Sequence, residues 1–166
     1  FHSLYLGTIY LDSIDNLIKQ KYIKEHLNDT IIIHKSELND KILYENCKSF
    51  KIIDQPFKTY RNLVVKKPWG FEFVSCEMEN LTLLVLHIKN NQSTSLHAHF
   101  LKDTPMILAQ GKLSIETVDN EYTEINVGDI TILNRKTVHK LRSHSDDTII
   151  LEWEMLKPNK NDLFRL

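Results

Sequence analysis

Three histidines, drawn from two separate segments, are the residues of this sequence whose types and spacing best suit chemistry. His97 and His99 are two positions apart in a segment expected to be a strand, where residues i and i+2 project from the same face. His139 follows in a later apolar run, which an antiparallel sheet can place beside the first. Three neutral imidazoles suit one divalent ion, and this donor set does not distinguish Zn, Fe, Mn and Ni. The pattern predicts a metal site made of His97, His99 and His139.

A simpler alternative stays open for the His-x-His pair taken alone. A strand can carry two polar residues on a face that meets only solvent, and His97-Ala98-His99 by itself fits that description. A true metal site would lose affinity at acid pH, because imidazole must be deprotonated to bind a metal.

The chain from residue 61 onward has the pattern of an all-β domain. Short apolar or alternating runs recur without an intervening helical pattern, separated by turn residues such as Asn90-Asn91 and Asp119-Asn120. The chain has only four glycines, so Gly111 and Gly128 are interpreted as positions where the backbone requires glycine. The runs cover residues 63–65, 71–76, 81–88, 106–108, 112–118, 124–125, 129–133, 138–141 and 148–155.

The first sixty residues carry no motif that can be attached to chemistry. Residues 11–27 have apolar side chains at helical spacing and predict a short N-terminal helix. The β-branched run at 30–33 predicts a strand, and the polar stretch 36–60 predicts short strands and turns.

Composition and charge exclude several classes of partner. The 21 basic and 22 acidic residues give a formal net charge of −1, so we expect no nucleic-acid partner. No apolar run approaches the roughly 20 residues that span a bilayer, so we expect no membrane partner. Cys47 and Cys76 form no CxxC pair, which favours reduced thiols in a cytoplasmic protein. Because the first residue is Phe1, we expect the chain to be trimmed or part of a longer one.

Two segments around these histidines resemble the two cupin signatures. In residues 91–111, His97, His99 and Gly111 fall on the signature histidines and closing glycine, with Asn91 at the first glycine. In residues 128–143, Gly128 and His139 match, while Asn134 and Lys136 replace the usual proline and glycine and Ser143 replaces the terminal Asn. The resemblance implies an antiparallel cupin barrel, the jelly roll or double-stranded β-helix, over residues 61–166. Residues 1–60 would then form a helix-and-strand extension packed on it.

The carboxylate that cupins usually add to the three histidines is missing. Thr104 occupies its position, and Asp103 lies one residue earlier. Successive side chains of a strand point to opposite faces, so Asp103 could supply a fourth ligand only if the strand bulges. The alternative is that Asp103 is a solvated turn residue, which leaves a three-histidine site.

Three further stretches are similar to the cupins of the type II mannose-6-phosphate isomerase group, which includes the C-terminal domains of mannose-1-phosphate guanylyltransferases. They are Lys67-Pro68-Trp69-Gly70-Phe71-Glu72, Ser93-Thr94-Ser95-Leu96 and Asn161-Asp162-Leu163-Phe164-Arg165. The resemblance implies an isomerase or epimerase that acts on a sugar phosphate or nucleotide sugar. Cupins of this kind commonly dimerise, so a homodimer is expected.

The same resemblance implies roles for four charged residues. Glu152 would move a proton, and Lys102, Lys140 or Arg165 would hold phosphate. Lys102 and Lys140 could equally be solvated charges, Arg165 a partner for an acid at the domain edge, and Glu152 part of a wet strand face. Two other functions stay open. One is a three-histidine iron dioxygenase, which also lacks the cupin glutamate, and the other is a non-catalytic sugar-binding or regulatory cupin domain.

Overall fold

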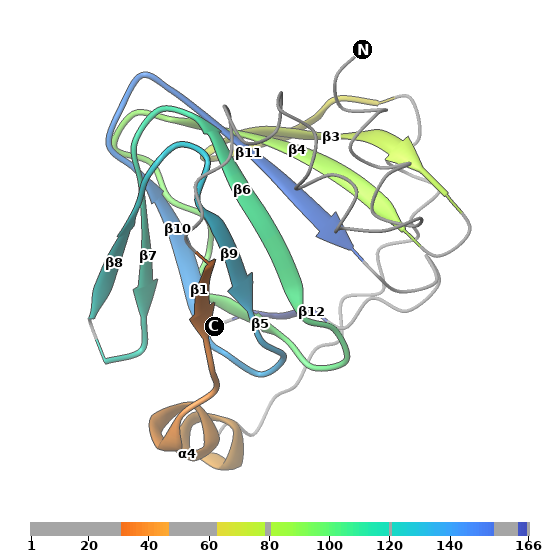
Figure 1. Ribbon diagram of the computed structural model, residues 1–166. Coiled ribbons are helices and arrows are strands. Elements are labelled where there is room, and N and C mark those ends of the chain that lie inside the picture. The colour runs from red at the N-terminus through yellow and green to blue at the C-terminus, as the bar shows by residue number, and fades with distance from the viewer. Residues whose placement is uncertain (1–30, 47–62, 79–80, 120, 155–162, 166) are drawn as a thin grey trace.

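Two β-sheets face each other in the computed structural model (Figure 1), which describes residues 31–46, 63–78, 81–119, 121–154 and 163–165. One sheet has the strand order β1-β9-β6-β11-β4-β3-β2 and the other has the order β12-β5-β10-β7-β8. All strand pairs are antiparallel except β1 with β9. The strands are β1 Ile31–His34, β2 Val65–Lys67, β3 Gly70–Glu77, β4 Thr82–Lys89, β5 His97–His99, β6 Thr104–Gln110, β7 Leu113–Thr117, β8 Tyr122–Ile125, β9 Ile130–Leu133, β10 His139–Ser143, β11 Asp147–Glu154 and β12 Leu163–Arg165.

The main hydrophobic core lies between the two sheets. Alternate residues of the central strands point inward, because successive side chains of a strand face opposite sides. The seven-stranded sheet supplies Leu86, Ile88, Met106, Leu108, Leu133 and Ile150, and the five-stranded sheet supplies Leu113, Ile115, Ile125 and Leu141. Two layers of interdigitating apolar side chains are the usual core of a β-sandwich or jelly roll.

The predicted all-β, antiparallel jelly roll is confirmed. Each predicted run that falls in the described residues overlaps a strand, and the bounds differ by a few residues. The run at 30–33 corresponds to β1, whose pairing with β9 adds a strand to the edge of the larger sheet. The predicted helix at 11–27 lies outside the described residues, and the division into 1–60 and 61–166 stays a prediction.

One expectation was wrong within the polar stretch 36–60. Residues Leu38–Asn46 form the helix α4, where short strands and turns were predicted. The Asp40 carboxylate accepts a hydrogen bond from the backbone N–H of Glu37 at 2.8 Å, which caps the first turn. Leu43 and Tyr44 pack on the barrel, so contacts distant in sequence stabilise this helix.

Two turns show what the backbone demands at the signature positions. Gly111 has φ +93°, and a side-chain carbon there would lie 2.6 Å from Ser145 Oγ and 2.7 Å from the carbonyl oxygen of Asp147. Lys136 has φ 69°, so a lysine adopts the left-handed conformation at the place where the cupin signature has glycine. This turn therefore contains a lysine in a backbone conformation that favours glycine.

Within the described residues, no helix is both long and apolar enough to cross a bilayer.

Candidate metal centre and cavity

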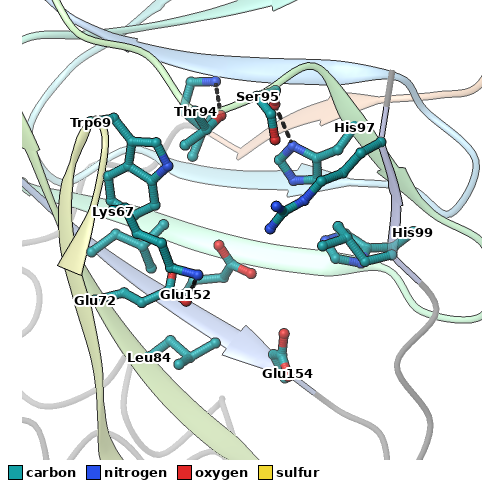
Figure 2. Close-up of a pocket in the computed structure, with 14 residues that line it drawn as sticks. Lys67, Trp69, Glu72, Leu84, Thr94, Ser95, His97, His99, Glu152 and Glu154 are labelled. Atoms are coloured by element: carbon teal, nitrogen blue, oxygen red, sulfur yellow. Dashed lines mark hydrogen bonds and ion pairs between the residues drawn. The ribbon is translucent and has the colours of Figure 1, made fainter. Parts of the chain in front are cut away.

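A cavity opens between the two sheets and is bounded by both (Figure 2). β3, β4 and β11 form one wall, and β5, β10 and β12 contribute to the other. Its charged and ionisable lining residues are His97, His99, Glu72, Glu152, Glu154, Lys67 and Arg165. The remaining lining residues are Trp69, Leu84, Leu86, Thr94, Ser95, Leu141 and Leu163.

The three predicted histidines lie close together, and two of them, His97 and His99, line this cavity. His139 of β10 pairs in register with His97 of β5, and their ring centroids are 4.5 Å apart. The centroid of His99 lies 5.3 Å from that of His97 and 6.4 Å from that of His139. His139 is 3% exposed and is not among the residues that line the cavity. Strand alternation and antiparallel pairing therefore gather all three imidazoles on the inner face.

Hydrogen bonds to the backbone fix the orientation of two of these rings. His97 Nδ1 lies 2.7 Å from the carbonyl oxygen of Ser95, and His139 Nδ1 lies 2.9 Å from that of Thr137. A carbonyl oxygen only accepts, so Nδ1 must carry the proton and Nε2 keeps its lone pair. This is the tautomer that a metal-ligating histidine needs.

Burial keeps these imidazoles neutral. It lowers the pKa of His97 to about 3, with a further contribution from the nearby His99. Burial and the neighbouring His97 also hold the pKa of His139 well below its ordinary value. Neutral imidazoles can bind a cation, whereas protonated ones cannot.

The donor types fit a divalent transition metal, but their present arrangement is not that of a formed site. No group of three or more His, Cys, Asp or Glu side chains in the described ranges is placed so that it could hold a metal ion. The fixed tautomers and the depressed pKa values are the features that favour metal binding. The metal site therefore stays a prediction, to be tested by metal analysis.

Glu152 is a carboxyl group of the cavity whose pKa is strongly raised. It lies on β11, is 8% exposed and forms no ion pair with another described residue. Burial raises its pKa to about 8, with Lys102 opposing and Glu154 and Glu72 adding to the shift. A cavity carboxyl group that exchanges its proton near neutral pH has the properties of a general acid or base.

Two ion pairs flank Glu152. Lys67 Nζ lies 2.8 Å from Glu72 Oε1 on one side, and Lys102 pairs with Glu154 on the other. Sequence reasoning missed Lys67, Glu72 and Glu154 as cavity residues. The signals were present, since Lys67 and Glu72 belong to one motif and Glu154 shares a strand face with Glu152.

The predicted phosphate-binding residues fall in different places. Arg165 is exposed, lines the cavity and pairs in register with His97. Lys102 is buried and paired with Glu154, so it is not a solvated charge. Lys140 points away from the cavity, where its Nζ lies 2.6 Å from Glu116 Oε2.

Asp103 also lies outside the cavity lining. One of its carboxylate oxygens accepts a hydrogen bond from the backbone N–H of Arg135 at 2.7 Å, and the other lies 3.3 Å from the Arg135 guanidinium. Thr104, the next residue, is buried, and its hydroxyl has no hydrogen-bond partner among the described residues. The structure therefore does not bring Asp103 to the three histidines.

Comparison with solved structures identifies the architecture. A protein with a double-stranded β-helix domain from Klebsiella pneumoniae matches with a TM-score of 0.52 at 17% identity, over 72% of this chain and 97% of that one. The chain has a cupin fold. KdgF from Halomonas sp. shares this cupin fold with a TM-score of 0.52 at 16% identity, over 60% of this chain and 89% of that one.

A third cupin-fold neighbour is the oxalate decarboxylase of Lactobacillus farciminis, with a TM-score of 0.53 at 13% identity. The match covers 63% of this chain but only 33% of the decarboxylase, so this chain spans about a third of its length. No protein-family model and no curated protein matches the sequence. At these identities the likeness establishes the cupin fold and leaves the function to the site.

Proposed function

We propose that this protein is a metal-dependent enzyme that moves a proton on a sugar phosphate or nucleotide sugar, as an isomerase or epimerase does. The observation that carries the proposal is that Glu152, with its pKa raised to about 8, shares one cavity with His97 and His99. Isomerisation and epimerisation both take a proton from a carbon next to a carbonyl group and return it. A carboxyl group whose pKa lies near the working pH suits both halves of that exchange.

The chain supplies a set of ligands and a set of binding groups. His97, His99 and His139 would hold one divalent ion through their Nε2 atoms. When bound, that ion would supply Lewis-acid polarisation of a substrate carbonyl or hydroxyl oxygen. Glu152 would hold and move the proton at its carboxyl oxygen, in a cavity wall that excludes much of the water.

Arg165 would bind the phosphate of the substrate, and Glu72 and Glu154 would bind its sugar hydroxyls. Arg165 is exposed at the cavity and can present a planar fork of donors to a phosphate. Lys102 is engaged by Glu154 and Lys140 by Glu116, so neither is given the phosphate role in this proposal. The Glu72 and Glu154 carboxylates can accept hydrogen bonds from sugar hydroxyls beside Trp69.

Proton exchange with solvent tests this proposal directly. The metal-supplemented protein, incubated in D₂O with hexose 6-phosphates and nucleotide ketohexoses, is expected to introduce deuterium at the carbon next to the carbonyl, as read by NMR. Glu152→Gln is expected to lower this rate by at least about 100-fold, since a positioned acid-base group contributes about that much or more. Glu116→Gln, a carboxylate on the outer face, is the matched control. Absence of exchange with the whole panel, or full exchange by Glu152→Gln, would contradict the proposal.

A second candidate is a three-histidine iron dioxygenase. Two observations favour it, namely the buried Thr104 at the position of the usual carboxylate ligand and the engagement of Asp103 by Arg135. The protein loaded with Fe(II) and given a small thiol such as cysteine would then consume oxygen in an electrode. Oxygen uptake without deuterium exchange would replace the first proposal by this one, and neither activity would favour a non-catalytic cupin.

A further inference from the structure

We propose that the segment 31–46, formed by β1 and α4 and called the brace below, positions the three histidines, with Asp40 and Tyr44 as its positioning residues. The inference rests on the proposed metal centre for its main readout, because the histidines matter here as ligands. It gives a role to a part of the chain that lies outside the cupin signatures. α4 follows β1 at one end of the barrel (Figure 1).

Asp40 ties the brace to the strand that carries His139. Its carboxylate is only 5% exposed and accepts a hydrogen bond from the backbone N–H of Val138 at 3.1 Å, across 98 residues of sequence. The other carboxylate oxygen accepts from the N–H of Glu37. A buried carboxylate is costly unless it is hydrogen bonded, so these two bonds define where Asp40 and Val138 must lie. Val138 directly precedes His139 and is fully buried.

The brace also covers the outer side of the histidine strands. Leu43 and Tyr44 of α4 pack against a cluster whose buried members are Ala98 and Val138. Ala98 stands between His97 and His99, and the Phe100 ring, next to His99, lies 4.9 Å from the Tyr44 ring. Since successive strand residues face opposite sides, α4 holds the outer neighbours while the imidazoles point inward.

The strained turn before His139 is the third point of contact. Lys136 has φ 69° in place of a glycine, and such a conformation persists only where the surroundings hold it. The Tyr44 hydroxyl donates a hydrogen bond to the carbonyl oxygen of Lys136, and the Lys136 N–H donates to that of His99 at 2.6 Å. The carbonyl oxygen of His34 in β1 accepts from the Asn134 N–H at 2.9 Å.

These contacts act on the geometry of the rings rather than on the ligands themselves. The Thr137 carbonyl oxygen that fixes the tautomer of His139 lies in the same turn. Loss of the bond from Val138 to Asp40 is therefore expected to loosen the orientation of His139. Removal of groups that orient a ligating histidine typically lowers metal affinity about 10- to 100-fold.

The test measures Zn²⁺ affinity by competition with a chelating dye, and the imidazole ¹⁵N resonances of the metal-free full chain. Asp40→Ala is expected to weaken Zn²⁺ binding at least about tenfold and to mix the tautomers of His139. Asp40→Asn keeps one acceptor oxygen for Val138 and should recover part of that affinity. Lys41→Ala, an exposed neighbour on the same helix, is the matched control and should behave as the wild type.

A gentler pair of variants keeps the proposal testable if Asp40→Ala does not fold. Tyr44→Phe removes only the hydroxyl and should cause a smaller loss of Zn²⁺ affinity than Asp40→Ala. Adding Lys136→Gly to Tyr44→Phe should recover part of that loss, because glycine adopts the left-handed conformation at position 136 without strain. Unchanged affinity and unchanged histidine tautomers in folded Asp40→Ala and Tyr44→Phe proteins would overturn the role of the brace. A wild type that binds no Zn²⁺ would count against the metal centre instead, while the tautomers of the metal-free protein would still decide about the brace.

Discussion

Glu152 on the inner face of the barrel and Glu116 on its outer face have pKa values shifted in opposite directions. Glu152 lies in the cavity, where burial raises its pKa to about 8. Glu116 lies on the outer side of β7, where it pairs with Lys140 and Arg142. Burial alone would raise the pKa of Glu116, but the hydrogen bonds and charges of these two cations lower it. The comparison shows that the surroundings of a carboxyl group, and not its residue type, decide whether it can exchange a proton near neutral pH.

The largest expected effect is on the free energy of unfolding, which the buried Glu152 carboxyl group lowers near neutral pH. A folded-state pKa of about 8 against an ordinary 4.5 means that folding takes up a proton between these pH values, so native stability falls as pH rises through this window. Glu152→Gln removes the ionisation and is expected to raise the free energy of unfolding by about 3 kcal/mol at pH 7. Urea unfolding at several pH values measures this.

The gain in the Glu152→Gln variant should shrink as the pH falls and vanish near pH 4, where the wild-type carboxyl group is protonated in both folded and unfolded states. The same variant should lose deuterium exchange, so stability and activity would change in opposite directions. A variant that is less stable than the wild type at pH 7 would show that Glu152 is ionised and well solvated, and would break the comparison.

Glu116→Gln is expected to have a smaller effect of the opposite sign. Because the folded-state pKa of Glu116 is lowered, its contribution is present above its ordinary pKa and is lost as pH falls through the folded-state value. The ion pairs are partly exposed, so the loss at pH 7 should be about 1 kcal/mol or less. It should also diminish at high salt, which screens exposed pairs. Salt-independent destabilisation in urea unfolding would argue against this account.

Asp103→Asn should have the smallest effect. The Asp103 and Arg135 side chains are 41% and 58% exposed, so their ion pair is screened by solvent and is expected to contribute little to stability. Metal content should not change either, because the structure leaves Asp103 outside the cavity. Elemental analysis of Asp103→Asn that shows lost metal would instead restore Asp103 as a fourth ligand.

The barrel and the position of the histidines followed from local patterns in the sequence. Alternation along single strands predicts which residues share a face, so the spacing of His97 and His99 sufficed to place them together. The resemblance of residues 91–111 and 128–143 to the two cupin signatures predicted that His139 lies beside this pair. The structure places His139 in register with His97.

The residues that sequence reasoning missed depend on contacts distant along the chain. The burial of Lys102 follows from its pairing with Glu154, 52 residues away, and residue type alone favours exposure for lysine. The helix α4 is only weakly amphipathic in sequence, and its stability depends on Asp40 reaching Val138 and on Leu43 reaching the barrel. Neither contact leaves a periodic pattern that a reading of one chain could detect.

The most direct test of the central idea is the metal content of the purified protein, measured by elemental analysis for the wild type, His99→Ala and His144→Ala. His144 is exposed and bonds to Ser114 away from the cavity, which makes it the matched control. We expect about one divalent ion per chain in the wild type and in His144→Ala, and none in His99→Ala. Equal metal content in all three proteins, or none in the wild type after incubation with Zn²⁺, Fe²⁺, Mn²⁺ and Ni²⁺, would contradict it.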